Sequence, residues 1–240
     1  EVYGGMMNAI GLQNPGIDLF CERDIPFLKK YDTKIIVNVC GHAPEEYLAV
    51  VERLADEPID MMEINISCPN VNAGFLAFGQ DAGHVEKLTA QIKKIAKQPV
   101  IMKLTPNVTD ITEIAKAAEA GGADAISLIN TLTGMKIDIN RKTFALANKT
   151  GGVSGPIVHP IAVRMVYQAA QAVKIPIIGM GGIQSAEDAI EFLFAGASAI
   201  SVGTANFYHP NITEEVVDGI RAYMEKNGFD KVSDMVGIVK

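Results

Sequence analysis

Residues 65–70, with the sequence Asn-Ile-Ser-Cys-Pro-Asn, carry the side chains in this chain that are best suited to chemistry. A carboxamide both donates and accepts hydrogen bonds, and the thiol of Cys68 can move a proton. Such groups suit a small planar substrate with alternating C=O and N–H edges and an acidic C–H bond. The alternative is an ordinary Asn-Pro loop in which Cys68 is a small buried hydrophobe. The hexamer by itself leaves both interpretations open.

The hexamer follows the strand-like run 61–64, and Pro69 disfavours both a helix at Cys68 and a central strand at its own position. The segment therefore indicates a strand that ends in a loop. Polar residues end other strand-like runs in the same way, namely Asn38, Lys103, Asn130 and Thr131. Asn is rare in strands, so the set favours a ligand site, although each Asn alone could cap a turn.

Lys103 lies in the apolar run 100–105, where an ammonium group is costly to bury unless an anion pairs with it. Two partners are possible. One is a protein carboxylate such as Glu63, and the other is the anionic ring of a reduced flavin.

Six short apolar, β-rich runs recur along the chain and predict buried parallel strands. They are 34–40, 61–67, 100–105, 125–131, 176–180 and 199–204. Helical spacing of apolar residues separates them, as in Val85, Leu88, Ile92 and Ile95 and in Ile111, Ile114 and Ala118. Capping boxes are expected at Asp110/Glu113 and Ser185/Asp188, and helix ends at Gly121, Gly196 and Gly228. The alternation predicts an α/β domain with a parallel sheet.

Glycine clusters come late in the chain, at 179–182 and 203–204, after the last two predicted strands. An open nucleotide-binding sheet usually has its Gly-rich turn after the first strand, whereas a (β/α)₈ barrel commonly holds a phosphate near its last strands. Each cluster alone could be a tight turn, but the pair favours a TIM (β/α)₈ barrel. Six of its eight strands are evident, and the other two would precede Glu1.

The glycine-rich segment 132–156 has no helical pattern. It predicts an excursion built around a hairpin, with 135–140 pairing with 143–147, and long loops of this kind are usually functional. A helix is expected to follow over about 157–173.

The composition bounds the class of protein. The chain has 240 residues, of which 48% are apolar, and this predicts one domain over 1–240. The net charge of -7 and the pI near 5.1 argue against nucleic acid or an anionic membrane as a partner. There is no membrane-spanning run and no secretory pattern. Three cysteines suggest a reduced cytoplasmic protein and exclude a cysteine-ligated iron–sulfur cluster within this chain. The four histidines have no metal-ligand spacing, so no metal site is predicted.

Seven motifs together resemble the class 1 dihydroorotate dehydrogenases over about residues 4–218. They lie at 8–14, 65–70, 103–107, 129–131, 151–156, 179–183 and 202–204. Segments 134–138 and 146–152 resemble the class 1B, NAD-linked catalytic subunit. The resemblance implies a TIM barrel that oxidises dihydroorotate to orotate on bound FMN in pyrimidine biosynthesis.

The resemblance also implies roles for individual residues. Cys68 would be the base, since a thiol with an ordinary pKa of about 8.5 can act near neutral pH. The substrate would contact Asn8, Ala9, Ile10, Gly11, Leu12, Asn65, Asn70, Asn130 and Thr131. FMN would contact Asn38, Asn65, Lys103 and Ile129 at its ring, and Gly155, Gly181, Gly182, Gly203 and Thr204 at its phosphate.

The electrons must then leave the flavin, and the chain has no second nucleotide-binding motif. The resemblance implies a partner subunit with FAD and a [2Fe-2S] cluster that reduces NAD⁺, and a homodimer of catalytic chains within a heterotetramer. Three alternatives stay open. They are a related FMN barrel acting on another dihydropyrimidine, a fumarate-linked class 1A enzyme, and an inactive truncated or merely phosphate-binding barrel.

Overall fold

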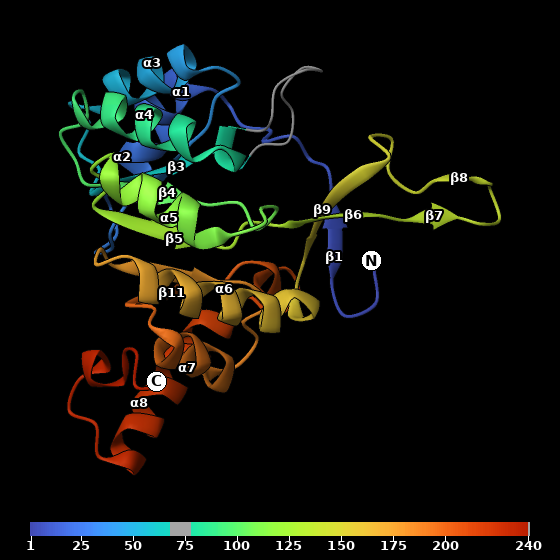
Figure 1. Cartoon of the computed structure of the whole chain (residues 1–240), viewed down its shortest axis with the longest axis vertical. Coiled ribbons are helices and arrows are strands. Elements are labelled where there is room, and N and C mark those ends of the chain that lie inside the picture. The colour runs from blue at the N-terminus through green and yellow to red at the C-terminus, as the bar shows by residue number, and fades with distance from the viewer. Residues whose placement is uncertain (68–77, 240) are drawn as a thin grey trace. The chain divides into compact units, whose positions relative to one another are not determined.

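The computed structural model describes residues 1–67 and 78–239 (Figure 1). The chain divides into two compact units. The first unit comprises Glu1–Ala9, Thr105–Thr112 and Leu128–Lys240, and the second comprises Ile10–Leu104 and Glu113–Ser127. No helix in the described residues is both long enough and apolar enough to cross a membrane.

The second unit is built on a parallel sheet with the strand order β5-β4-β3-β2. The strands are β2 (Ile36–Val39), β3 (Met61–Asn65), β4 (Val100–Lys103) and β5 (Ala125–Leu128). They alternate along the chain with α3 (Pro44–Leu54), α4 (Ala82–Lys93) and α5 (Ile111–Ala120). An earlier helical segment consists of α1 (Ile17–Leu19), a π-helical turn (Phe20–Asp24) and α2 (Ile25–Leu28).

One face of each strand in this sheet is apolar and buried. In β2 and β3 the side chains of Val37, Val39, Met62 and Ile64 are 0–9% exposed. The helices contribute buried apolar residues at the expected spacing, including Val85, Leu88 and Ile92 of α4 and Ile111, Ile114 and Ala118 of α5. This separation leaves the other face of the strands available for polar side chains.

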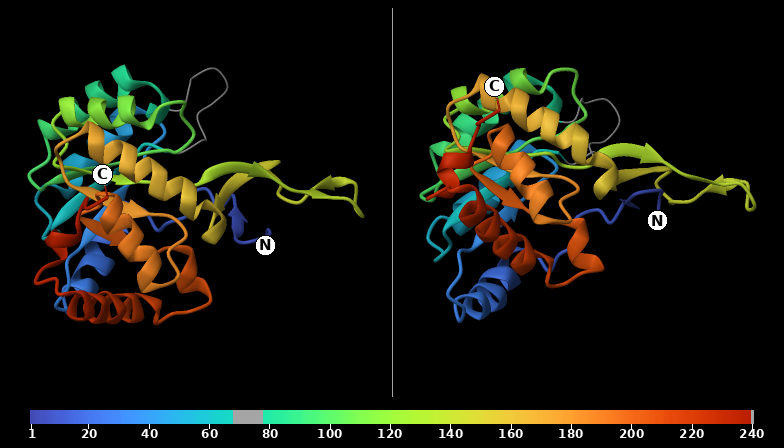
Figure 2. Two further views of the ribbon diagram at one scale, coloured as in Figure 1. Left: turned by 60° about the horizontal axis from the view of Figure 1, so that its bottom comes forward. Right: turned by 90° about the horizontal axis from the view of Figure 1, so that it is seen from below.

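The first unit holds the parallel pair β10 (Ile177–Met180) and β11 (Ala199–Ser201) with helices α6 (His159–Ala172), α7 (Ala186–Ala195) and α8 (Ile212–Asn227). It also holds an antiparallel sheet in the order β1-β9-β6, made of Met6–Asn8, Thr150–Ser154 and Leu132–Met135. Beyond that sheet, β7 (Ile137–Asp138) pairs with β8 (Thr143–Phe144), and Figure 2 shows this hairpin at the tip of an extended arm.

The predicted elements are confirmed with shorter bounds. All six apolar runs contain a strand, the hairpin pairs Ile137 with Phe144, and α6 occupies most of 157–173. Helix α4 ends at Lys93, so Ile95 lies beyond it. Gly196 and Gly228 end α7 and α8 with φ of 114° and 73°, in the left-handed region where glycine is favoured.

The predicted capping box at Ser185/Asp188 is only partly formed. Ser185 accepts a hydrogen bond from the Asp188 N–H at 3.1 Å, as expected for the N-cap of α7. The Asp188 carboxylate, however, accepts from the N–H of Gln184 at 2.8 Å rather than from that of Ser185. At α5, the Asp110 carboxylate accepts from the Thr112 N–H at 2.8 Å.

Candidate active site

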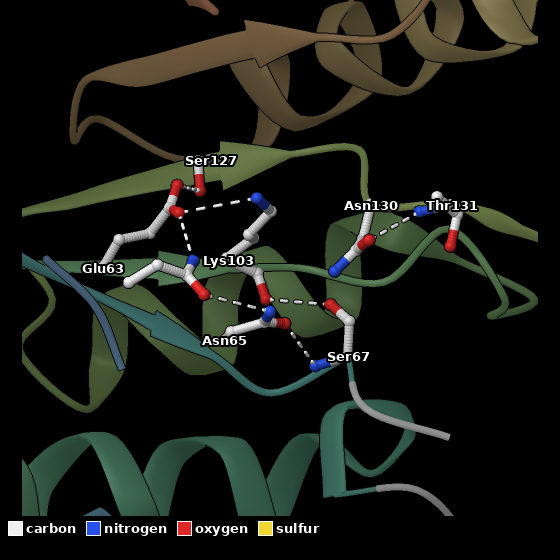
Figure 3. Close-up of polar contacts among 8 residues, drawn as sticks. Glu63, Asn65, Ser67, Lys103, Ser127, Asn130 and Thr131 are labelled. Atoms are coloured by element: carbon white, nitrogen blue, oxygen red, sulfur yellow. Dashed lines mark hydrogen bonds and ion pairs between the residues drawn. The ribbon is translucent and has the colours of Figure 1, made fainter. Parts of the chain in front are cut away.

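The strand register of the second unit brings five polar residues onto one face of its sheet. Asn38 is paired with Glu63, Asn65 with Lys103, and Lys103 with Ser127. Glu63 and Asn65 are two positions apart on β3, so their side chains share a face as well. We call Asn38, Glu63, Asn65, Lys103 and Ser127 the amide–lysine cluster (Figure 3).

Glu63 is the centre of this cluster. Its carboxylate accepts hydrogen bonds from the Asn38 Nδ2 at 2.5 Å and the Ser127 Oγ at 2.6 Å, and its Oε2 lies 3.5 Å from the Lys103 Nζ (Figure 3). The side chains of Lys103 and Glu63 are only 19% and 13% exposed. The structure therefore confirms Glu63 as an anionic partner for Lys103. Ser127 was not predicted, because a serine inside an apolar strand gives no signal of its partner.

The end of β3 is held by three contacts. Asn65 is buried, and its carbonyl oxygen accepts from the Tyr47 hydroxyl of α3 at 2.8 Å. The Asn65 Oδ1 accepts from the Ser67 N–H at 3.2 Å, and the Ser67 Oγ donates to the Lys103 carbonyl oxygen at 3.2 Å. These contacts fix the backbone up to Ser67. The predicted residues Cys68 and Asn70 lie outside the described residues.

The thiol of Cys21 is buried in the helical segment that precedes β2. It lies in the π-helical turn and is 6% exposed. Burial raises the pKa of the Cys21 thiol, and the nearby Glu57 carboxylate raises it further. The Cys21 side chain is therefore part of the apolar core of the second unit.

In the first unit, hydrogen bonds from backbone and side-chain groups restrain residues 129–131. The N–H of the buried Ile129 donates to the Met180 carbonyl oxygen of β10 at 2.9 Å. The Asn130 Oδ1 accepts from the Thr131 N–H at 2.8 Å. Asn107 donates through Nδ2 to the Thr131 carbonyl oxygen at 3.0 Å. Asn107 was not assigned a role from the sequence, and its part is to hold this segment in place.

The predicted residues Asn8 and Thr131 come together at the glycines of β9. Asn8 is opposite Gly152 in the β1–β9 ladder. A β-carbon at Gly152 would meet the Thr131 hydroxyl, and one at Gly151 would lie 2.7 Å from the Asn8 carbonyl oxygen. Glycine is therefore required in β9 for this approach. Ala9 follows Asn8 in the first unit.

The predicted residues Ile10, Gly11 and Leu12 belong to the second unit. All three are exposed, and the exposed fraction of Ile10 reaches 70%. Gly11 and Leu12 both adopt positive φ, 78° and 59°. The left-handed region is uncommon for a residue such as Leu12, and such conformations concentrate in ligand-binding segments.

A small polar cleft contains four of the five predicted phosphate contacts. We call it the glycine cleft. Its lining is Gly155, Pro156, Gly182, Ile183, Gln184, Gly203, Thr204, Ala205 and Tyr208. Gly181, the fifth predicted residue, precedes Gly182 in the turn after β10. The Thr204 hydroxyl donates to the Ser154 hydroxyl at 2.8 Å, so Ser154 is a further polar residue here that the sequence did not reveal.

The glycine cleft fits an anionic group. It has no carboxylate among its lining residues. A β-carbon at Gly155 would lie 2.8 Å from the Gly5 Cα, and one at Gly182 would lie 2.8 Å from the Gly155 carbonyl oxygen. At these glycines the backbone itself lines the cleft, and backbone N–H groups in turns of this kind are suitable donors to phosphate oxygens.

Substitution of two of these glycines by alanine should have different effects on stability. Gly182 has φ of 74° and no room for a β-carbon, so Gly182→Ala is expected to lower the free energy of unfolding by about 1–3 kcal/mol. Gly203 has nothing within 4 Å of the same position, so Gly203→Ala should be close to neutral. Thermal melts of the two variants test this, and equal melting temperatures would contradict the geometry.

Comparison with known proteins gives a consistent result. The sequence model of the family described as dihydroorotate dehydrogenase matches residues 1–224. The chain is 66% identical over 240 residues to the dihydroorotate dehydrogenase B (NAD(+)), catalytic subunit, of Lachnoclostridium phytofermentans, covering 100% of this chain and 80% of that protein. Proteins of the same name are 59% identical in Alkaliphilus metalliredigens (99% of this chain, 78% of that protein) and 51% identical in Thermoanaerobacter pseudethanolicus (98% and 78%).

The family match covers nearly the whole chain, and the parallel strand–helix alternation agrees with it. The chain therefore belongs to the dihydroorotate dehydrogenase family, a family of flavin-dependent oxidoreductases with the TIM-barrel fold.

Proposed function

We propose that this chain is the catalytic subunit of an NAD-linked dihydroorotate dehydrogenase and oxidises dihydroorotate to orotate in de novo pyrimidine biosynthesis. The observation that carries the proposal is the 66% identity over all 240 residues to a catalytic subunit of that name. The continuous family match over residues 1–224 further supports a single FMN-binding domain over 1–240.

FMN is proposed as the bound flavin, and it would supply the hydride acceptor. At its ring, the residues proposed to contact it are Asn38, Asn65, Lys103 and Ile129. The ammonium group of Lys103 suits negative charge on that ring, and its pairing with Glu63 holds it in the cluster. At its phosphate, the proposed contacts are Gly155, Gly181, Gly182, Gly203 and Thr204. The glycine backbone, the Thr204 hydroxyl and the lack of carboxylates among the lining residues of the glycine cleft support this assignment.

The substrate is proposed to lie against the amide side chains. Oxidation of dihydroorotate removes a proton from the carbon next to a ring carbonyl and a hydride from the neighbouring carbon. Cys68 is proposed to take the proton. The alternating donors and acceptors of the pyrimidine are matched by carboxamides. The residues proposed to line it are Asn8, Ala9, Ile10, Gly11, Leu12, Asn65, Asn70, Asn130 and Thr131.

The relatives are named as catalytic subunits, which implies a second, electron-transfer subunit. We propose that this partner carries FAD and a [2Fe-2S] cluster and passes electrons to NAD⁺. We further propose a homodimer of catalytic chains in a heterotetramer, located in the cytoplasm.

Anaerobic reduction tests the proposal on the purified chain. Dihydroorotate should bleach the bound flavin, whereas dihydrouracil should not. Bleaching by dihydrouracil alone would favour the alternative of another dihydropyrimidine as substrate. Reoxidation by fumarate, without a partner subunit, would identify the class 1A alternative. A flavin that stays oxidised with both pyrimidines would overturn the proposed activity.

A further inference from the structure

His159, the first residue of α6, connects the turn after β10 to helix α7. Its Nδ1 lies 3.1 Å from the Gly181 carbonyl oxygen, and its Nε2 lies 2.9 Å from a carboxylate oxygen of Glu191. The ring packs edge-on against Phe192 with centroids 5.3 Å apart, and its side chain is only 13% exposed. The imidazole ring is therefore restrained by one contact at each ring nitrogen and by the packing of Phe192 against it.

The partners of the ring assign its protons. A carbonyl oxygen only accepts, so the Nδ1 that faces Gly181 must carry hydrogen. The Glu191 carboxylate likewise accepts from Nε2, and the Asp188 carboxylate lies 3.9 Å from the same nitrogen. A ring that carries hydrogen on Nδ1 donates to the Gly181 carbonyl oxygen, whether or not Nε2 carries hydrogen as well.

That hydrogen bond bears directly on the glycine cleft. The Gly181 carbonyl and the Gly182 N–H belong to one planar peptide unit, in which they point in opposite directions. Fixing the carbonyl toward His159 therefore fixes the direction of the N–H of Gly182, a residue that lines the cleft. Two adjacent glycines have wide conformational freedom, with φ of 137° and 74° here, so an external contact is needed to select one orientation.

Packing adds to the same restraint. A β-carbon at Gly182 would lie 2.9 Å from the His159 Cβ, and one at Gly181 would lie 2.7 Å from the Ala162 Cβ. The turn after β10 therefore packs closely against the first residues of α6, and His159 is one of the residues in contact with it.

We propose that His159 is a positioning residue for the phosphate end of the flavin, acting through its Nδ1–H on the Gly181–Gly182 peptide. This inference rests on the proposed function, in that the anion held in the glycine cleft is taken to be the FMN phosphate. It assigns to His159 a part in affinity for FMN but none in affinity for the flavin ring.

Two substitutions separate the two ring nitrogens. The amide nitrogen of Asn reaches about where Nδ1 lies, and that of Gln reaches about where Nε2 lies. His159→Asn should keep the hydrogen bond to Gly181, and His159→Gln should lose it. Glu191→Gln serves as the matched control, because it alters only the Nε2 side of the ring.

The measurement is the dissociation constant of the full chain, freed of flavin by dialysis, for FMN and for riboflavin, which lacks the phosphate. His159→Gln should weaken FMN binding about tenfold, as expected for one lost hydrogen bond. His159→Asn and Glu191→Gln should bind FMN within about twofold of the unmodified chain, a difference well below one hydrogen bond. Riboflavin affinity should be the same in all four proteins.

The inference is overturned if His159→Gln binds FMN like the unmodified chain, or if it loses FMN and riboflavin to the same extent. Unmodified chain that binds neither flavin would instead refute the proposed function. The measurement therefore distinguishes a failure of the inference about His159 from a failure of the proposed function.

Discussion

Cys68→Ala is expected to slow reduction of the flavin by dihydroorotate by about 10²–10⁴-fold, the usual contribution of a positioned general base. Alanine has no group to take the proton, whereas the proposed flavin contacts are unchanged, so the flavin should stay bound. Anaerobic stopped-flow absorbance measures the rate at saturating dihydroorotate. The visible spectrum before mixing gives the flavin content.

Cys21→Ala is the matched control for this experiment, because Cys21 is a buried core thiol in a helical segment. Its rate of flavin reduction, expressed per bound flavin, should equal that of the unmodified chain. An undiminished rate in Cys68→Ala would remove Cys68 from the role of base.

Glu63→Ala is expected to be strongly destabilising. It leaves the largely buried ammonium group of Lys103 without the Glu63 carboxylate and removes the acceptor of Asn38 and Ser127. Removing one partner of a buried pair costs about 3–5 kcal/mol, and the partial exposure here favours the lower end, about 3 kcal/mol. For a chain of this size, that lowers the melting temperature by roughly 6–12 °C. Urea and thermal unfolding monitored by circular dichroism measure both quantities.

Asp56→Ala provides the comparison, since Asp56 pairs with Lys97 at the surface, where the side chains are 85% and 62% exposed. Surface pairs contribute about 0–1 kcal/mol, so its melting temperature should hardly change. The double variant Glu63→Ala/Lys103→Met should recover part of the loss, because the unpaired charge is gone. Equal melting temperatures for Glu63→Ala and Asp56→Ala would show that the amide–lysine cluster does not stabilise the sheet.

Much of the candidate site could be predicted from the sequence because strand ends are a local property. Asn38, Asn65 and Lys103 each follow an apolar run, and in parallel strands such residues meet at one end of the sheet. Gly182 and Gly203 of the cleft were also recognisable, because their position after β10 and β11 is visible in the order of elements. Family membership then confirmed the barrel class that these features favoured.

The contacts that hold these residues could not be predicted. Ser127, Tyr47 and His159 have no distinctive neighbours in sequence, and their partners are set by strand register and by helix packing. Strand β9 was missed for a related reason. Its sequence, Thr-Gly-Gly-Val-Ser, has low strand propensity, and it becomes a strand because β1 and β6 pair with it on both sides.

The β1–β9 ladder also bears on how the protein reaches its native state. It joins Met6 to Ser154, whereas β6 and β9 are the two sides of one local hairpin. Closing the longer loop costs more chain entropy, so the hairpin can form early and β1 docks onto it afterwards. We therefore expect Asn8 to reach its native position only once β9, which carries its partner Gly152, has formed.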